Sequence, residues 1–146
     1  MKPTLIVRGE EWPKPTIRQI PYWEVEEVWN EVSPMLQKAI DRQDEWTLEG
    51  VKQTLMQANS TSQLWKVGNT SAIVTMIQSF QTGVRKCLLF LGGGTDMENS
   101  LHTHAEIESW AKKYFGCHKM IIHGRKGWLK VLDGYEEVTT CMEKKL

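Results

Sequence analysis

The feature that most constrains the fold is an uninterrupted apolar run, Cys87-Leu88-Leu89-Phe90-Leu91, at the end of a strand-like segment. Side chains of a strand point alternately to the two faces of a sheet, so a run without polar residues requires apolar cover on both faces. We therefore expect Val84–Leu91 to form a central strand with other elements packed on each side. This requirement favours an α/β architecture with flanking helices.

The hydrophobic period changes along the chain, and the changes predict the order of the elements. A period near 3.6 residues indicates an amphipathic helix, whereas a period of two indicates a strand. In chain order we expect a strand at Thr16–Ile20, a helix with its stripe at Val25, Val28, Trp29 and Val32, a second helix from Ser33-Pro34 to about Arg42, a third helix at Leu48–Gln57, and strands at Ser62–Val67, Ser71–Phe80 and Val84–Leu91. Gly68-Asn69 fits the two-residue turn of a hairpin.

The last third of the chain predicts a crossover. Thr103 and Glu106 have the spacing of a capping box, and Gly116 is placed to end the helix that follows. The apolar stripe of this helix is Ile107, Trp110, Ala111 and Tyr114. After it we expect a buried strand at Lys119–His123, parallel to the central strand, a short helix at Arg125–Leu132 ended by Gly134, and a closing strand at Tyr135–Met142.

Composition limits the class of protein. The chain has 146 residues, 40% hydrophobic and 25% charged, which is typical of one soluble domain. We expect residues 1–15 to form an extended arm and residues 16–146 a single domain. No run of apolar residues is long enough to span a membrane. The three cysteines, Cys87, Cys117 and Cys141, lack metal-like spacing and cannot all pair, which favours a reducing cytoplasm.

The charge is unevenly distributed although the net charge is zero. Residues 1–50 hold six Lys/Arg and ten Asp/Glu, while Lys112–Lys130 contains six basic residues and no acidic one. That basic stretch could face a polyanion such as a nucleotide cofactor, or it could be a solvated helix and loop. The zero net charge does not favour a nucleic-acid partner. Trp12, Trp23 and Trp29 could form a contact surface, although core packing is the default interpretation.

Two segments carry a resemblance to a known family. Residues 107–122 (IESWAKKYFGCHKMII) resemble the cofactor-supporting helix and fifth strand of the GNAT N-acetyltransferases, and residues 128–138 (WLKVLDGYEEV) resemble the family's closing helix, glycine, aromatic residue and strand. With the element order, the resemblance covers residues 16–144. It implies a GNAT-like mixed sheet of about six strands, with strands two to four antiparallel, a parallel crossover between strands four and five, and flanking helices. Residues 124–135 (GRKGWLKVLDGY) are also similar to small GNAT-like proteins encoded among the head and virion-assembly genes of tailed bacteriophages.

The resemblance implies a position for acetyl-CoA. The family binds its pyrophosphate at the turn between strand four and the long helix, through backbone N–H groups and the positive end of the helix. The cofactor-binding candidates at that turn are Gly92, Gly93 and Gly94, and Arg125 could add charge to a phosphate. The family's usual motif, Arg or Gln followed after two residues by Gly-x-Gly or Gly-x-Ala, is absent. Asp96 and Glu98 would repel phosphates unless they point away, so a flexible loop is the alternative interpretation.

The sequence does not assign a catalytic residue. The family's frequent general acid is a tyrosine about four residues before its last glycine, and Lys130 occupies that position here. General-base candidates are the acidic and imidazole side chains of His102, His104, Glu106, Glu108 and His123. Glu106 is better explained by the capping box, Glu108 by solvent exposure, and His123 as a structural histidine. The spacing of His102, His104, Cys117 and His118 does not suit a metal, and none is expected.

Two functions remain open at this stage. The favoured hypothesis is a GNAT-fold protein with a degenerate cofactor site that acts through contacts with virion or assembly proteins of a phage, in the host cytoplasm or on the virion. The alternative is an acetyl-CoA-dependent N-acetyltransferase that acts on an amine of a protein or small molecule. The missing motif and the missing tyrosine favour the first, whereas the glycine triplet and the basic stretch favour the second.

Overall fold

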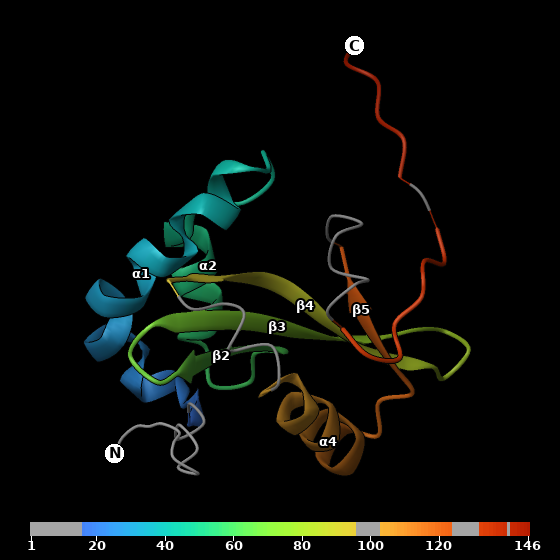
Figure 1. Cartoon of the computed structure of the whole chain (residues 1–146), viewed down its shortest axis with the longest axis horizontal. Coiled ribbons are helices and arrows are strands. Elements are labelled where there is room, and N and C mark those ends of the chain that lie inside the picture. The colour runs from blue at the N-terminus through green and yellow to red at the C-terminus, as the bar shows by residue number, and fades with distance from the viewer. Residues whose placement is uncertain (1–15, 96–102, 124–131, 140) are drawn as a thin grey trace, which may run out of the picture.

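The fold is known from a computed structural model that describes residues 16–95, 103–123, 132–139 and 141–146. In chain order the elements are β1 (Ile17–Ile20), the 3-10 helix η1 (Tyr22–Glu24), α1 (Val25–Asp41), α2 (Leu48–Leu55), β2 (Ser62–Val67), β3 (Ser71–Ser79), β4 (Arg85–Gly94), α4 (His104–Phe115) and β5 (Lys119–Ile122). Figure 1 shows α1 and α2 on one face of the sheet and α4 on the other. The predicted α/β architecture is confirmed.

The sheet is mixed and its strands lie in chain order, β1-β2-β3-β4-β5. The pairs β1–β2, β2–β3 and β3–β4 are antiparallel, and β4–β5 is parallel. The parallel pair is joined through α4, as the crossover prediction required. Five strands lie within the described residues, close to the expected six. The predicted bounds of β2 are correct to the residue.

Helix α1 is one helix where the sequence predicted two. It continues through Pro34, which is exposed and cannot donate a backbone hydrogen bond to the preceding turn. One apolar stripe runs the whole length of α1, through Val25, Trp29, Val32, Leu36 and Ile40, and all five side chains are buried. Burial of that stripe against the sheet outweighs the local cost of the proline, so the helix break predicted at Ser33 is wrong.

Helix α2 begins at a side-chain cap. The Thr47 hydroxyl accepts a hydrogen bond from the backbone N–H of Gly50 at 3.0 Å, which satisfies one of the free amides of the first turn. Val51 and Leu55 face the core, and the helix ends at Leu55 instead of Gln57. The loop between α1 and α2 places Trp46 edge-on against Phe90 of β4, with ring centroids 5.4 Å apart.

Strand β4 has apolar cover on both faces, as its apolar run predicted. Cys87 and Leu89 lie in the core cluster under α4, with Trp65, Ile107 and Ala111. Phe90 and Leu91 pack in the second cluster, under α1 and α2. Because both faces of β4 are covered, this strand links the two cores of the molecule.

Helix α4 ends where the sequence predicts, but its apolar stripe differs from the predicted one in the last turn. Gly116 ends the helix with a left-handed backbone (φ 61°), as predicted. Trp110 packs edge-on against Trp65 at 4.9 Å. Tyr114, predicted to be on the apolar stripe, is 66% exposed, and Phe115 packs against the core in its place. The helix therefore presents its apolar side one residue later in its last turn.

The C-terminal predictions are only partly tested. Strand β5 forms as predicted, but none of its residues is buried, because it borders the sheet within the described residues. The closing strand predicted at Tyr135–Met142 is wrong for the residues described there, which are neither helix nor strand. The predicted arm at residues 1–15 and nearly all of the predicted helix at Arg125–Leu132 lie outside the described residues.

We expect Leu36→Ala to lower the free energy of unfolding by about 2–5 kcal/mol, because the substitution empties a fully buried site between α1 and the sheet. Urea unfolding followed by tryptophan fluorescence measures the change. Lys38→Ala, on the exposed face of the same helix, is the matched control and should change stability by less than about 0.5 kcal/mol. Equal effects of the two substitutions would contradict the assigned face of α1.

Candidate functional site

The candidate site is built around an irregularity in β4. The β3–β4 register pairs Val74 with Leu91 but the next residue, Thr75, with Leu89. Phe90 is therefore an extra residue on β4, which is the definition of a β-bulge. A bulge bends its strand and changes which face the following side chains point to. This explains why Leu89 packs under α4 while both Phe90 and Leu91 pack under α1 and α2.

The parallel ladder between β4 and β5 ends where the bulge begins. The last paired residues are Leu89 and Ile122, and β4 continues for five residues to Gly94. Strand β5 offers no partner to Phe90–Gly94, so this part of β4 is paired through its β3 edge alone within the described chain. Backbone N–H and C=O groups require partners, and a free strand edge can take an extended ligand.

The glycine triplet lies in this stretch of strand, not in a turn. Gly92, Gly93 and Gly94 pair with Ile73, Ala72 and Ser71 of β3, which corrects the predicted position of the turn. A Cβ atom on Gly93 would lie 2.1 Å from the Met35 carbonyl oxygen of α1. Gly94 has φ 142°, and a Cβ there would lie 2.1 Å from the Thr70 carbonyl oxygen. Packing thus requires glycine at both positions.

Other members of the predicted site are placed differently. Arg125 and His102, together with Asp96 and Glu98, lie outside the described residues. His123 follows β5 directly and is exposed. His118 lies directly before β5, and its Nδ1 accepts a hydrogen bond from the Arg85 backbone N–H at 3.1 Å. No cluster of His, Cys, Asp and Glu that could hold a metal occurs in the part of the chain that the structure describes.

The start of α4 differs from the predicted capping box. Thr103 has a helical backbone (φ −74°, ψ −10°), and its side chain makes no capping hydrogen bond. A capping residue normally has an extended backbone, which directs its oxygen to the free amides of the first turn. The capping box is therefore wrong, and Glu106 is an exposed carboxylate in the first turn of α4.

His104 is the buried imidazole of the site. It is 6% exposed and shares the sheet-facing side of α4 with Ile107 and Ala111. Its Nδ1 has no hydrogen-bond partner among the described residues. Burial lowers the pKa of His104, so the imidazole is neutral at pH 7 and is a weaker base than an exposed histidine. Among the base candidates in the described part of the chain, His104 is the one with a buried side chain.

Glu108 and Tyr135 form a contact that the sequence did not predict. The Tyr135 hydroxyl donates a hydrogen bond to Glu108 Oε2 at 2.9 Å, so Glu108 is engaged and only partly exposed. Burial, together with the Glu108 carboxylate, raises the pKa of Tyr135 well above its usual range. A tyrosine that holds its proton so firmly is a poor general acid, so Tyr135 does not replace the missing family tyrosine.

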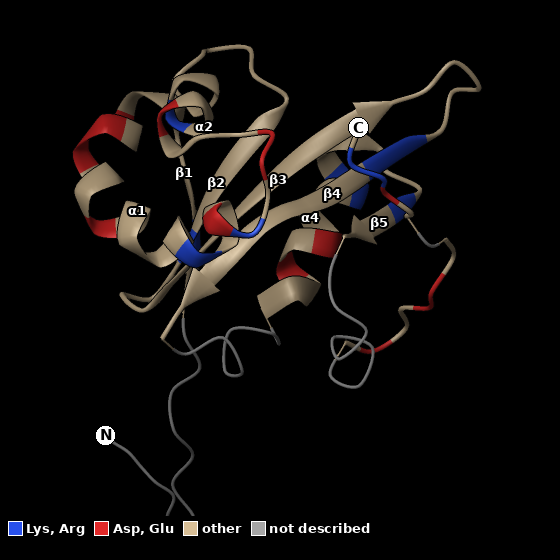
Figure 2. Ribbon diagram, turned by 90° about the horizontal axis from the view of Figure 1, so that it is seen from above, with Lys and Arg blue, Asp and Glu red and all other residues tan. Residues whose placement is uncertain are grey.

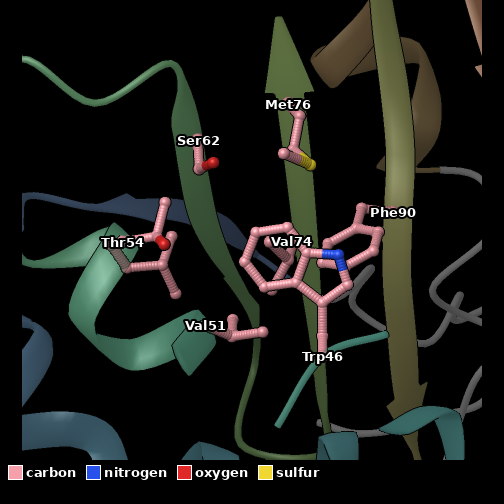
Figure 3. Close-up of a pocket in the computed structure, with 8 residues that line it drawn as sticks. Trp46, Val51, Thr54, Ser62, Val74, Met76 and Phe90 are labelled. Carbon is pink, nitrogen blue, oxygen red and sulfur yellow. The ribbon is translucent and has the colours of Figure 1, made fainter. Parts of the chain in front are cut away.

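A small apolar pocket lies beside the bulge on the α1 and α2 face. Its lining residues come from α2, the preceding loop and strands β2 to β4: Trp46, Val51, Thr54, Leu55, Ser62, Val74, Met76 and Phe90. Figure 3 shows the Trp46 indole in front of Val74 and beside the Phe90 ring. The lining contains no charged side chain, and the space inside is too small for more than about one water molecule.

Acidic and basic residues lie on different elements of the structure, as their uneven distribution along the sequence suggests. In Figure 2 the positions of acidic residues are coloured on α1 and those of basic residues on β4 and β5. Two of the acidic residues on α1 are paired, Glu26 with Lys52 at 2.5 Å and Glu31 with Lys66 at 2.8 Å. At the other end of the sheet, Lys86 and Lys119 lie side by side in the β4–β5 register. The basic stretch predicted from Lys112 onward is thus partly a surface of α4 and β5.

Comparison with solved structures shows what fold this is. An aminoglycoside acetyltransferase from an uncultured soil metagenomic sample, in complex with sisomicin, superimposes with a TM-score of 0.66 at 10% identity, covering 91% of this chain and 97% of that one. A GNAT family acetyltransferase of Staphylococcus aureus gives 0.62 at 12% identity, covering 92% and 100%. A ribosomal-protein-alanine N-acetyltransferase of Brucella melitensis gives 0.60 at 7%, covering 90% and 99%.

The chain therefore has the fold of the GNAT acetyltransferases, as the sequence resemblance implied. At these identities the likeness establishes the fold alone. No family model and no curated protein matches the sequence. The comparisons give no support to the resemblance to phage proteins. No described helix is both long and apolar enough to cross a membrane.

The bulge is the site feature that sequence reasoning missed. The continuous apolar run at Cys87–Leu91 hides it, because a register shift by one residue leaves an apolar side chain on either face. The glycines that follow were a usable signal. A glycine inside a strand often marks a bulge or a close backbone approach, and Gly93 marks such an approach.

We expect Gly93→Ala to destabilise the protein by about 1–3 kcal/mol, near the upper end, because a backbone oxygen cannot move aside as a side chain can. Thermal or urea unfolding measures the loss. Gly83→Ala is the comparison, since a Cβ at Gly83 meets nothing within 4 Å and the cost comes only from its positive φ of 91°. A neutral Gly93→Ala would mean that α1 does not approach β4 so closely.

His104 predicts a pH dependence of stability. Because burial lowers its pKa in the folded state, the unfolded chain binds the proton more tightly. Stability should be complete above the ordinary histidine pKa of about 6.5 and fall as the pH drops from there through the folded-state pKa.

Urea unfolding at several pH values tests this, with His104→Gln expected to flatten the profile by up to about 1.4 kcal/mol per pH unit. His123→Gln, at an exposed position, should keep the wild-type profile. Identical profiles for wild type and His104→Gln would show that His104 does not titrate with folding.

Proposed function

We propose that this chain is an acetyl-CoA-dependent N-acetyltransferase that binds acetyl-CoA along the free edge of β4. The observation that carries the proposal is the bulge at Phe90 together with the end of the β5 ladder at Leu89. Together they leave Phe90–Gly94 with one strand partner in the described chain. The GNAT acetyltransferase fold around this edge supports the same assignment.

The residues present suit the chemistry of acetyl-CoA. Its thiol arm contains amide groups, which can exchange hydrogen bonds with the backbone of Phe90–Gly94 as a neighbouring strand would. The absence of side chains at Gly92–Gly94 leaves backbone N–H groups accessible to phosphate. Helix α4, the next element after β4 in the chain, begins at His104, and its N-terminus carries the positive end of the helix dipole. Arg125 remains our candidate for a charged phosphate contact.

Acetyl-CoA, when bound, supplies a thioester carbonyl that an amine nitrogen can attack. A backbone N–H of β4 would then donate a hydrogen bond to the oxygen on which negative charge develops. The neutral imidazole of His104 and the exposed carboxylate of Glu106 are the candidate groups to accept the amine proton. Because Lys130 stands at the position of the family's tyrosine, we assign no side chain as general acid.

A second candidate function is protein contact without catalysis, as in phage virion assembly. Tyr22 and Trp23 favour it: they are 43% and 70% exposed and stack edge-on at 5.1 Å. Exposed aromatic pairs of this kind are common at interface hot spots. Trp29 is buried in the core, as the default interpretation of the tryptophans predicted, whereas Trp23 is exposed. The missing cofactor motif and the absent tyrosine also favour this candidate.

Isothermal titration with acetyl-CoA and CoA decides between the two functions. ATP is the matched control, because it shares the adenosine and a phosphate chain but lacks the amide-containing arm. We expect heat of binding from acetyl-CoA and CoA and much less from ATP. At a ligand concentration one hundred times Kd, stability should rise by about 2.7 kcal/mol.

Hydrogen exchange read by peptide locates the ligand. Amides of Phe90–Gly94 should exchange more slowly with acetyl-CoA present, whereas those of α2 should not change. Gly93→Asp is unsuitable as a binding variant, because a side chain there collides with Met35 whether or not a ligand binds. No heat at millimolar acetyl-CoA would remove the enzyme proposal and leave protein contact as the function.

A further inference from the structure

Two lysines lie side by side where the β4–β5 ladder begins. Lys86 of β4 and Lys119 of β5 are register partners, and the residues that follow them, Cys87 and Met120, pack under α4. Because side chains alternate along a strand, both lysines extend from the opposite face of the sheet. Neither forms an ion pair with a carboxylate in the described part of the chain. Like charges at neighbouring positions repel each other, so a bound anion would stabilise the pair.

An exposed aromatic ring lies beside these lysines. Phe80 directly follows β3, in the hairpin that leads to β4, and is 46% exposed. Figure 1 shows this hairpin at the opposite end of the sheet from α1 and α2. The Nζ of Lys86 lies 5.2 Å from the centre of the Phe80 ring, so the ring and the charge belong to one surface. One exposed ring is ordinary on a protein surface, so this pair alone indicates no ligand.

A second ring and lysine lie at the same end of the sheet. The Nζ of Lys113 is 5.4 Å from the centre of the Tyr114 ring, which is 66% exposed. Both residues are in the last turn of α4. The guanidinium of Arg85, at the start of β4, donates a hydrogen bond to the carbonyl oxygen of Phe115 at 2.8 Å. This bond fixes the end of α4 beside the start of β4, so both ring–lysine pairs flank one end of the sheet.

We call this surface the basic end and define it by five residues: Phe80, Lys86, Lys113, Tyr114 and Lys119. The zero net charge of the chain does not oppose an anionic partner there. Helix α1, which carries acidic residues, meets β4 near its far end, at Gly93. Strand β4 has 10 residues, so its two ends are roughly 30 Å apart. Exposed charges are screened over about 8 Å at physiological salt, so the acidic residues of α1 have little effect at the start of β4.

The chemistry of the basic end fits a single-stranded nucleic acid better than other anions. Each phosphate of its backbone carries a negative charge that a lysine can neutralise. Each unpaired base has a flat face that can stack on an exposed ring. An acidic peptide would use the lysines and leave the rings without a role. A duplex keeps its bases stacked on one another, so it would leave the rings unused as well.

We propose that the basic end binds a single-stranded nucleic acid, with phosphates at Lys86 and Lys119 and a base stacked on Phe80. Lys113 and Tyr114 contact the strand further along its length. This surface is at the start of β4, whereas the edge proposed for acetyl-CoA is at the end of the same strand. The two proposals therefore stand or fall separately.

Fluorescence anisotropy of a labelled oligothymidylate, titrated with the full-length protein, tests the proposal. We expect saturable binding that weakens as salt rises, because bound phosphates release counterions. A labelled duplex of the same length should bind about fivefold more weakly, since its bases are not free to stack. Binding of an oligouridylate or of the oligothymidylate supports the proposal, and their ratio shows which sugar is preferred. No saturable binding of either at about 100 µM protein overturns it, whether or not acetyl-CoA binds.

A pair of charge variants locates the surface. Lys86→Gln/Lys119→Gln should weaken binding by about tenfold and reduce the slope of log Kd against log salt by about 1.4, because each phosphate contact contributes about 0.7. Lys38→Gln/Arg42→Gln removes the same charge from exposed positions at α1 and should change neither quantity. Equal effects of the two variants would mean attraction by overall charge and would overturn the proposal. If the first variant shifts the urea unfolding midpoint, Lys119→Gln alone, at an exposed position, should still reduce the slope by about 0.7.

A ring variant distinguishes a nucleic acid from other polyanions. Phe80→Leu keeps an apolar side chain but removes the stacking surface, and binding should weaken about fivefold. Tyr22→Leu, at an exposed ring on η1, is the matched control and should have no effect. An unchanged affinity in Phe80→Leu, with polyglutamate competing as well as the oligonucleotide, would identify an acidic protein as the partner and overturn the proposal. Displacement of the oligonucleotide by CoA would place it at the acetyl-CoA edge and overturn the assigned surface.

Discussion

The close contact between α1 and β4 determines the arrangement of the rest of the structure. The Met35 carbonyl occupies the space where a Cβ of Gly93 would lie, so the helix backbone rests directly on the strand. This approach allows the whole apolar stripe of α1, from Val25 to Ile40, to be buried under one helix. It also explains why α1 is not broken at Pro34. Breaking the helix there would lift its second half off the strand and expose Leu36 and Ile40, at a cost above that of one lost hydrogen bond.

The bulge at Phe90 is explained by the change of neighbouring elements along β4. Up to Leu89 the strand is shared between β3 and β5, and beyond it the strand must meet the backbone of α1. One extra residue changes the direction of the strand and moves an additional aromatic side chain to the α1 and α2 face, where it contacts Trp46. Pairing between β4 and β5 ends at the same place, after Leu89. The free edge of β4 that is proposed to bind acetyl-CoA therefore results from the packing of β4 against α1. The glycines that this part of β4 requires also leave its backbone without covering side chains.

The sequence predicts a helix or strand correctly where its local residue pattern is compatible with only one structure. The alternation in Ser62–Val67 and the glycine at position 116 each identify an element that the structure contains. The failures occur where a tertiary contact overrides a local signal. Pro34 predicts a break that burial prevents. Gly92–Gly94 predict a turn, but they lie in β4, where α1 approaches too closely for any side chain at Gly93. The Thr103 spacing predicts a cap that a helical backbone excludes. The bulge in β4 was not predicted, because a register shift within an apolar run leaves no pattern in the sequence.

Strand β5 sets the start of the proposed acetyl-CoA site, because its ladder with β4 ends at Leu89. A four-residue strand with no fully buried residue has little stability of its own. The side of the proposed site that β5 provides therefore depends on β4, to which all four residues of β5 are paired.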